Sequence, residues 1–129
     1  MKGGKLLAIL TPETKKIISE QLCLIATVNK QGQPNIAPKG TMRVLNNEEL
    51  VYAEIFGETT LQNILDNPEA IMVVAVDRET KKLVRLQGKA EVIREGELYE
   101  KIAKQVEEIK RGFPKPKAAI KIKVKKLIS

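Results

Sequence analysis

Two short segments of the sequence combine residue types that bind anions. Residues 38–41 (Pro-Lys-Gly-Thr) place a basic side chain and a hydroxyl between residues that interrupt regular strands. Because proline and glycine break the hydrogen-bonded ladder, backbone N–H and C=O groups stay available there for a ligand. Thr59 and Thr60 open a short amphipathic segment, where hydroxyls and unpaired helical N–H groups can hold a phosphate. Together the two segments predict a site for a flat phosphorylated ligand.

Each segment also has a purely structural interpretation. Thr59 and Gln62 have the T-x-x-Q spacing of a capping box, in which the threonine hydroxyl only satisfies the start of a helix. Residues 38–41 alone are typical of a bulge in a barrel strand. The binding hypothesis therefore depends on whether the fold brings the two segments together.

The elements that must position these residues follow from hydrophobic periodicity. Apolar, β-branched runs predict strands over residues 22–29, 50–55, 70–76, 83–93 and 118–128, with an interrupted strand over 34–45. Caps and apolar stripes predict helices over residues 11–21, 59–66 and 97–111, with Thr11 and Thr59 as N-caps and Gly112 at the C′ position. In an antiparallel hairpin, residues 38–41 would lie beside residues 52–55.

These elements predict a mainly β protein with helices (α+β), folded as one domain over residues 1–129. About six antiparallel strands at short spacing, with two or three flanking helices, indicate a closed or nearly closed β-barrel with the helices packed outside. A chain of 129 residues that is 43% hydrophobic is long enough for one such core.

Composition excludes several kinds of chemistry. The sequence contains no histidine and one cysteine, Cys23, so histidine-based triads, histidine metal ligands and internal disulfides are ruled out. Cys23 lies in an apolar run and is expected to be a small buried side chain. An enzyme with this sequence would therefore depend on a cofactor for its chemistry.

The net charge of +7 is compatible with an anionic partner. Lys121, Lys123, Lys125 and Lys126 fall on one face of the last predicted strand, where lysine protects an exposed sheet edge. A nucleic-acid-binding barrel is the alternative, although that strand lacks the aromatic residues that stack on bases. No apolar run approaches the roughly 20 residues of a membrane span, and the N-terminal patch lacks a full signal-peptide pattern, so we expect a cytoplasmic protein.

The order of several motifs resembles the pyridoxamine-5′-phosphate-oxidase-like family of FMN-binding split β-barrels. The motifs are the turn at residues 31–34 (Gln-Gly-Gln-Pro), the N-x-x-NP pattern at residues 63–68 and the strand end at residues 88–91 (Gly-Lys-Ala-Glu). The resemblance covers roughly residues 21–93. In size and pattern the chain is most similar to the small FMN-binding proteins of that family. It implies a split β-barrel homodimer that binds FMN in a groove at the dimer interface.

The resemblance also implies which residues contact the cofactor. Two threonines stand where relatives often have a basic residue at the phosphate, so Lys39 or Arg43 would supply the positive charge. Phe113 would pack on the flavin ring from the partner subunit, or it is a plain interface or core aromatic. The matching positions are Pro38, Lys39, Gly40, Thr41, Arg43, Glu54, Ile55, Thr59, Thr60, Asn63 and Phe113.

The departures from the family limit the expected activity. True pyridoxamine-phosphate oxidases carry a C-terminal arginine and histidine segment for the substrate phosphate, which this sequence lacks. The sequence therefore favours an FMN-binding oxidoreductase or electron-transfer protein with a small-molecule or protein redox partner. A split barrel that binds deazaflavin F420 or another flavin-like cofactor remains the alternative.

Overall fold

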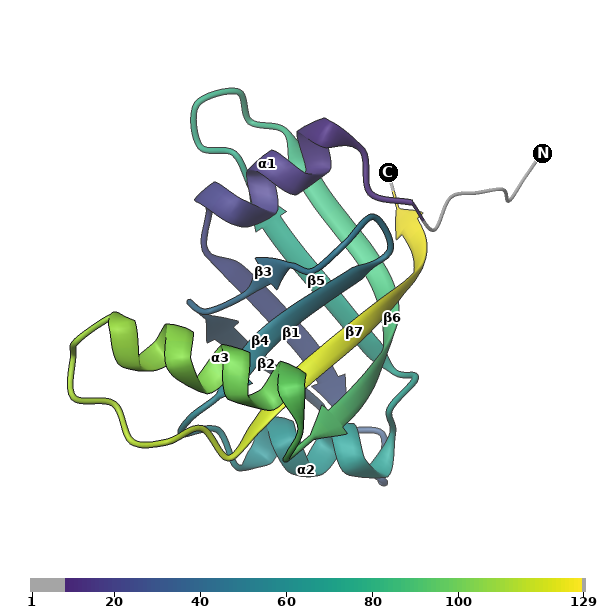
Figure 1. Cartoon of the computed structure of the whole chain (residues 1–129). Helices are drawn as coiled ribbons and strands as arrows, with labels where there is room; N and C mark the ends of the chain where they lie inside the picture. Colours follow the sequence, from purple (N-terminus) through teal and green to yellow (C-terminus); the bar gives the residue numbers. More distant parts are fainter. Residues whose placement is uncertain (1–8, 129) are drawn as a thin grey trace.

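The computed structural model describes residues 9–128, which fold as a curled antiparallel sheet with three helices (Figure 1). The first eight residues, which include most of the patch compared with a signal peptide, lie outside the described residues. The helices are α1 (Pro12–Glu20), α2 (Thr59–Asp66) and α3 (Glu97–Glu108). The strands are β1 (Cys23–Val28), β2 (Pro34–Lys39), β3 (Arg43–Val44), β4 (Glu49–Glu54), β5 (Ile71–Val76), β6 (Leu83–Ile93) and β7 (Ala118–Ile128).

The two edge strands of the sheet are connected by a short link in the sequence. Its strands run in the order β2-β1-β5-β6-β7-β4-β3, and every neighbouring pair is antiparallel. The two edge strands, β2 and β3, are consecutive in sequence, so residues 40–42 connect one edge of the curled sheet to the other. This arrangement confirms the predicted split β-barrel, with two-residue β3 as the additional short strand.

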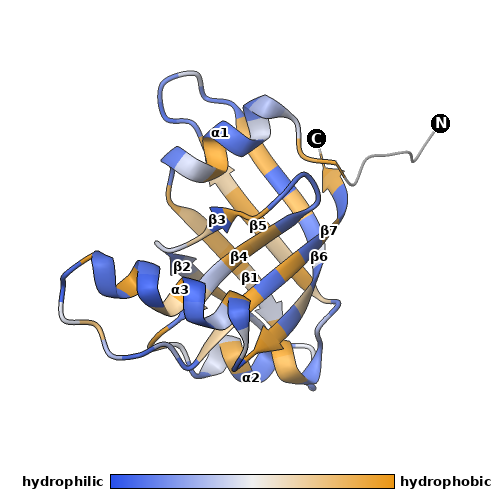
Figure 2. Ribbon diagram, viewed as in Figure 1, coloured by the Kyte–Doolittle hydropathy of each residue, from blue (hydrophilic) through white to orange (hydrophobic). Residues whose placement is uncertain are grey.

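Apolar side chains fill two separate cores. The larger one lies inside the curled sheet and includes Ile25, Tyr52, Val73, Leu86 and Ile122. The smaller one lies between α3 and the outer face of β4 and β7, which therefore have apolar residues on both faces at that end. Figure 2 shows hydrophobic and hydrophilic residues alternating along β7, as the period of a strand that separates a core from solvent requires. No helix within residues 9–128 has the length and apolar character needed to cross a bilayer.

The ends of the helices follow local sequence signals. The Thr11 hydroxyl accepts a hydrogen bond from the Thr14 N–H, and Pro12 occupies the first position of α1, as predicted. α2 ends at Asp66, directly before Asn67 and Pro68, as predicted from the restriction that proline places on its predecessor. The N-cap of α2 is Glu58, and no side chain caps it, so the predicted Thr59 capping box was wrong.

The start of α2 was misjudged because the chain enters it from a bend. Glu58 already has helical backbone angles, so Thr59 is the first helical residue rather than the N-cap. Its hydroxyl therefore does not occupy the capping position. Gln62 instead donates to the Asp66 carboxylate one turn further on. The predicted end of α3 was also wrong, because the helix ends at Glu108 with Ile109 as its C-cap. Lys110, with a φ of 58°, therefore occupies the C′ position, and Gly112, with a φ of 72°, lies two residues further on.

Two predicted pairings were corrected by the strand order. β2 pairs with β1, with Lys39 opposite Cys23, so residues 38–41 do not form a hairpin with β4. β7 is not an edge strand, because it lies between β6 and β4. Lys121 pairs with the carboxylates of Glu49 and Glu91 at 3.6 and 3.5 Å, and Lys123 pairs with Glu48. These two lysines therefore belong to a ladder of ion pairs across the outer face of the sheet.

Candidate functional site

The two edges of the curled sheet meet beside a cavity of about 420 Å³, which we call the edge cavity. Its walls come from the end of β2, the link to β3, the end of β4 and the loop that follows α3. Seven of the predicted site residues lie there, and Arg43, Thr59, Thr60 and Asn63 do not. The lining residues are Pro38, Lys39, Gly40, Thr41, Ala53, Glu54, Ile55, Phe56, Gly57, Ile109, Arg111 and Phe113.

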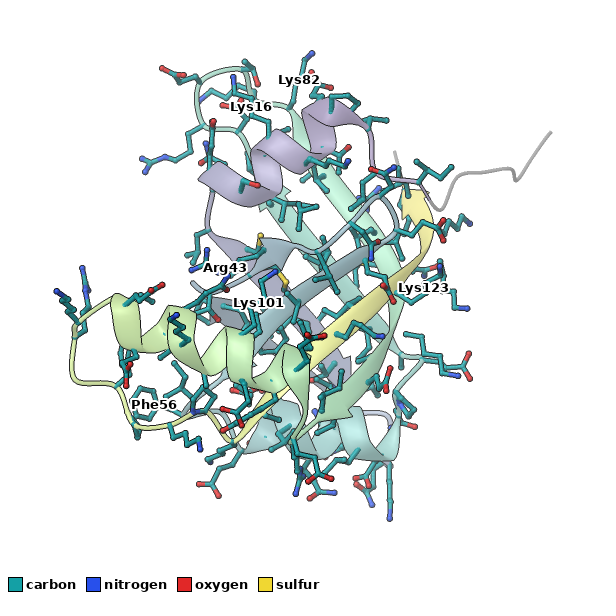
Figure 3. The ribbon with its side chains drawn as sticks, viewed as in Figure 1. Lys16, Arg43, Phe56, Lys82, Lys101 and Lys123 are labelled. Atoms are coloured by element: carbon teal, nitrogen blue, oxygen red, sulfur yellow. The ribbon has the colours of Figure 1, made fainter. Side chains whose placement is uncertain are left out.

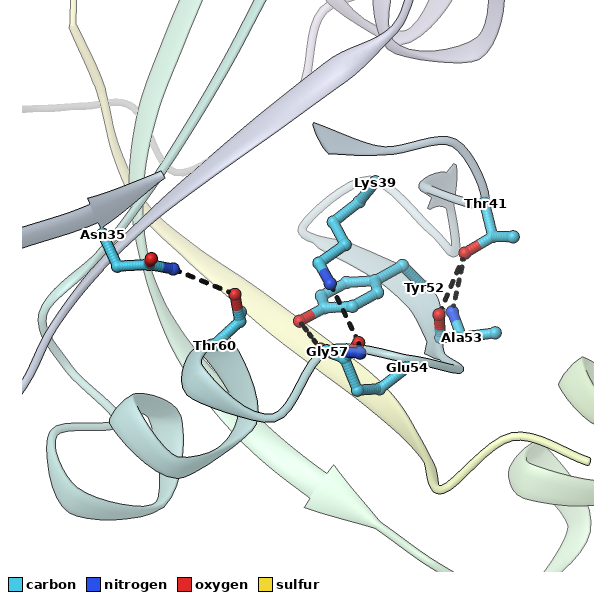
Figure 4. Close-up of polar contacts among 8 residues, drawn as sticks. All are labelled: Asn35, Lys39, Thr41, Tyr52, Ala53, Glu54, Gly57 and Thr60. Atoms are coloured by element: carbon cyan, nitrogen blue, oxygen red, sulfur yellow. Dashed lines mark hydrogen bonds and ion pairs between the residues drawn. The ribbon is translucent and has the colours of Figure 1, made fainter. Parts of the chain in front are cut away.

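An ion pair is buried in the wall of the edge cavity. Lys39 Nζ lies 2.8 Å from Glu54 Oε2, with the Lys39 side chain 10% exposed and the Glu54 side chain 1% exposed (Figure 4). The same carboxylate accepts hydrogen bonds from the Tyr52 hydroxyl at 3.1 Å and from the Gly57 N–H at 3.0 Å. Glu54 thus connects β2, β4 and the segment that leads into α2.

Tyr52 forms the apolar floor beneath this pair. Lys39 Nζ lies 5.3 Å from the centre of the Tyr52 ring, which places the ammonium on an aromatic face. Burial, and then the negative charge of Glu54, raise the pKa of Tyr52 far above its usual range. The tyrosine therefore remains a neutral hydrogen-bond donor to the carboxylate.

Thr41 closes the gap between the two edges of the sheet. Its hydroxyl accepts from the Ala53 N–H at 3.0 Å and lies 3.2 Å from the Ala53 carbonyl oxygen, to which it donates (Figure 4). Residues 38–41 thus lie beside the end of β4 as predicted, but side chains rather than a backbone ladder make the connection.

Two aromatic residues stand at the rim of the edge cavity. Phe56, just after β4, and Phe113, in the loop after α3, have ring centres 6.0 Å apart at an interplanar angle of 70°. Phe56 is 66% exposed, although burying such a side chain is favourable. Figure 3 shows Phe56 at the end of the molecule where the loop after α3 turns back. Phe113 thus contacts another aromatic of the cavity within its own chain, and its predicted packing on a ligand from the partner subunit stays a prediction.

Thr59 lies in a neighbouring hollow of about 410 Å³, which we call the helix-start hollow. Arg94 and Lys117 also line it. Both cations follow from the pairing of β6 with β7, because Arg94 comes directly after the end of β6 and Lys117 directly before the start of β7. Two cations, a hydroxyl and the N-terminal end of α2 therefore share one surface with the carboxylate of Glu58.

Thr60 and Asn63 face the protein interior and fasten α2 to the sheet. The Thr60 hydroxyl accepts from the Asn35 side chain at 3.1 Å, and the Asn63 amide donates to the Thr27 hydroxyl at 3.0 Å. Both are buried, so in this structure their polar groups serve contacts within the chain. Arg43 is exposed on β3, opposite Val51, and lines neither cavity.

Sequence reasoning missed several residues of this region, among them Phe56, Gly57, Arg94 and Lys117. Phe56 and Gly57 directly follow the predicted site residues Glu54 and Ile55 and line the same cavity, so extending the segment beyond Ile55 would have found them. Arg94 and Lys117 are distant in sequence, and only the register between β6 and β7 brings them together. The available signal was their position, because each is a basic residue directly beside the end of a predicted strand.

The described residues contain little other reactive chemistry. Burial raises the pKa of the Cys23 thiol to about 11, so it stays protonated at neutral pH, and its predicted burial is confirmed. No group of three potential metal-ligating side chains occurs within residues 9–128.

The fold is a split β-barrel with a cavity where the sheet edges meet. The chain belongs to the pyridoxamine 5′-phosphate oxidase family, whose model matches residues 10–128. It is 36% identical over 117 residues to the uncharacterized protein MJ0282 of Methanocaldococcus jannaschii, and the match covers 89% of this chain and 76% of that protein. HupZ of Group A Streptococcus is 37% identical with a TM-score of 0.84, covering 93% of this chain and 98% of that chain.

More distant solved structures share the fold alone. An FMN-binding protein from Syntrophomonas wolfei is 17% identical with a TM-score of 0.72, covering 88% of this chain and 81% of that chain. An F420 reductase is 17% identical with a TM-score of 0.69, covering 88% and 94%. The heme storage protein HutZ from Vibrio cholerae is 22% identical with a TM-score of 0.67, covering 93% and 94%. This fold therefore accommodates several cofactors.

Proposed function

We propose that this protein is a flavoprotein that binds FMN in the edge cavity and acts in oxidation–reduction or electron transfer. The observation that carries the proposal is the cavity itself, in which strand-end backbone, a buried ion pair and two rim aromatics meet. Family membership and an FMN-binding neighbour with the same fold support it. The flavin would supply the redox chemistry, and the protein would bind, orient and electrostatically control it.

The residues present suit the isoalloxazine ring of a flavin. A flat ring with polar edges needs apolar or aromatic walls and a few hydrogen-bonding groups. Ile55, Phe56 and Phe113 provide the apolar surface, whereas the interrupted backbone of residues 38–41 provides N–H and C=O groups. The predicted roles of Pro38, Lys39, Gly40, Thr41, Glu54, Ile55 and Phe113 therefore become part of this proposal.

The phosphate would be held at the helix-start hollow. Thr59 offers a hydroxyl at the start of α2, and Arg94 and Lys117 offer the positive charge that sequence reasoning sought at Lys39 or Arg43. Lys39 is already neutralised by Glu54, which makes it a poor phosphate ligand. Thr60, Asn63 and Arg43 would support the site indirectly, through the positions of α2 and β3.

Haem and nucleic acid fit this chain less well. Haem proteins use an axial ligand such as histidine, cysteine or tyrosine, but the sequence has no histidine, and Cys23, Tyr52 and Tyr99 are buried. A nucleic-acid surface would need unpaired cations, whereas Lys121 and Lys123 pair with glutamates. The same site would also suit deazaflavin F420, so the choice of cofactor is a matter for direct titration.

Binding is tested by titrating the purified protein with FMN, FAD, F420 and haemin. We expect FMN to bind with a shift in its visible absorption and a change in its fluorescence, and to bind more tightly than the other three. Unchanged FMN spectra would overturn the proposal, and tighter binding of F420 or haemin would reassign the cavity.

The phosphate assignment is tested by comparing FMN with riboflavin, which lacks the phosphate. Replacing both Arg94 and Lys117 by Gln should weaken FMN about tenfold or more and leave riboflavin nearly unchanged, because charge-assisted hydrogen bonds to phosphate are lost. Thr59→Ala should act in the same direction with a smaller effect. Lys125→Gln is a matched control that removes a cation far from the hollow. Equal weakening of both ligands would show that the cations have no role at the phosphate.

We further propose a homodimer that works with a small-molecule or protein redox partner in the cytoplasm. Leu22 just before β1, Leu24 on β1, Ile36 on β2 and Val76 on β5 are exposed apolar residues, which together we call the apolar strip. This strip reaches the edge cavity at Pro38, which pairs with Leu24. A second copy on the strip would bring its residues close to the cavity.

A further inference from the structure

We propose that Glu54 is a positioning residue that sets the redox potential of the bound flavin by neutralising Lys39. The inference rests on the proposed FMN site and concerns how that site distinguishes the oxidised from the reduced ring. It is carried by the buried ion pair in the wall of the edge cavity (Figure 4).

Charges in this wall act strongly on whatever fills the cavity. With the Lys39 side chain 10% exposed and the Glu54 side chain 1% exposed, little water screens either group. Arg111 also lines the cavity, but it is exposed and therefore screened by solvent. Among the described residues that line the cavity, Lys39 is thus the least screened cation, and a carboxylate 2.8 Å away cancels most of its field.

The position of the carboxylate is fixed from three sides. The Tyr52 hydroxyl holds one carboxylate oxygen, and the Gly57 N–H and Lys39 hold the other. A Cβ atom at Gly57 would lie 2.6 Å from Glu54 Oε2 and 2.8 Å from Lys39 Nζ, so no other residue fits there without moving the pair. Tyr52 and Gly57 therefore hold the Glu54 carboxylate beside Lys39.

Reduction changes the charge of a flavin ring. When a neutral ring takes up two electrons and one proton, it gains one unit of negative charge. An unpaired Lys39 beside the ring would favour that reduced form, whereas the Lys39–Glu54 pair as a whole favours neither form. Glu54 therefore keeps the cavity electrically balanced and holds the potential lower than Lys39 alone would set it.

The experiment measures dissociation constants for oxidised FMN and for FMN reduced with dithionite, at neutral pH without oxygen. For Glu54→Gln, the ratio of the reduced to the oxidised constant should fall about tenfold or more, because Lys39 loses its partner. For Lys39→Met, the ratio should rise by a similar factor, because the carboxylate then stands alone. Glu48→Gln, which breaks the exposed pair with Lys123, is the matched control and should leave the ratio unchanged.

Opposite changes in the two variants support the inference. Ratios that stay within twofold of the wild-type value, or that move in the same direction, would overturn it, because a purely structural role weakens both forms of the ligand together. If wild-type protein binds no FMN, the proposed function itself is wrong and the inference falls with it. Circular dichroism confirms that each variant is folded, and a direct potential titration of the bound flavin must reproduce the sign of each shift.

Discussion

At the scale of single residues, the site is organised by contacts around one buried carboxylate. The Glu54 carboxylate accepts hydrogen bonds from Lys39 at the end of β2, Tyr52 in β4 and Gly57 just after β4. A buried ion pair contributes little net stability, but removing one partner leaves an uncompensated charge and costs about 3–5 kcal/mol. The Lys39–Glu54 pair therefore constrains the sequence strongly at every position that it touches.

We expect Gly57→Ala to destabilise the protein by about 1–3 kcal/mol, because the new methyl group would overlap the buried pair. The measurement is the free energy of unfolding in urea. Gly40→Ala is the matched control, since nothing lies within 4 Å of a Cβ atom built there. Equal stability of both variants would mean that the pair moves aside without cost.

We expect Cys23 to resist alkylation in the native state. Its pKa of about 11 leaves about one thiol in a thousand ionised at pH 8, and the side chain is 1% exposed. Modification by iodoacetamide should therefore require unfolding and should reach the rate of a free thiol only in denaturant. Rapid labelling of the native protein would show that β1 opens readily at this position.

Residue types alone predicted one part of this site but not the contacts that its side chains make. Proline, glycine and lysine at residues 38–40 predicted an interrupted basic segment, because their backbone limits are local properties. That Lys39 is neutralised by Glu54, and that Thr60 and Asn63 face inward, depends on how β2, β4 and α2 lie in space. No local pattern contains that information.

At the scale of the elements, β6 and β7 are the two longest strands of the sheet, and they pair with each other. Their register shifts between Gln87 and Gly88, where a bulge bends the sheet. A Cβ atom at Gly88 would lie 2.8 Å from the Lys123 carbonyl oxygen and 2.6 Å from Ile122 Cγ2. The backbones of the two strands therefore approach closely here.

We expect Gly88→Ala to cost about 1–3 kcal/mol, because the obstructing atom belongs to the backbone and cannot rotate away. Thermal unfolding followed by circular dichroism provides the measurement. Gln87→Ala, one residue earlier on the exposed face, serves as the control. A small effect of Gly88→Ala would imply that the bulge can slide along β6.

The sequence predicted the boundaries of the long strands, but it did not predict their order in the sheet. Clean alternation fixed β6 at residues 83–93 and β7 at residues 118–128, and both match the structure. Alternation says which face of a strand is apolar, but not which strand lies beside it. The lysine-rich face of β7 was therefore assigned to an edge, although glutamates of β4 and β6 pair with it inside the sheet.

At the scale of the whole molecule, the exposed apolar strip over Leu24 and Ile36 supports the proposed homodimer. We expect sedimentation equilibrium to show a dimer of the 14.4 kDa chain and Leu24→Glu to shift it towards monomer, since a charge at the centre of an interface is costly. Leu65→Glu, an exposed leucine on α2, is the matched control. A wild-type monomer at micromolar concentration would contradict the proposal.

The central place of β7 has a consequence for how the protein is made. On the ribosome, β4 and β6 emerge before the strand that joins them, because β7 follows both in the chain and pairs with each. Until residues 118–128 are synthesised, the nascent chain exposes two unsatisfied strand edges and an unfilled core. The barrel can therefore close only after β7 has been synthesised, because β7 supplies the pairing partner of both strands.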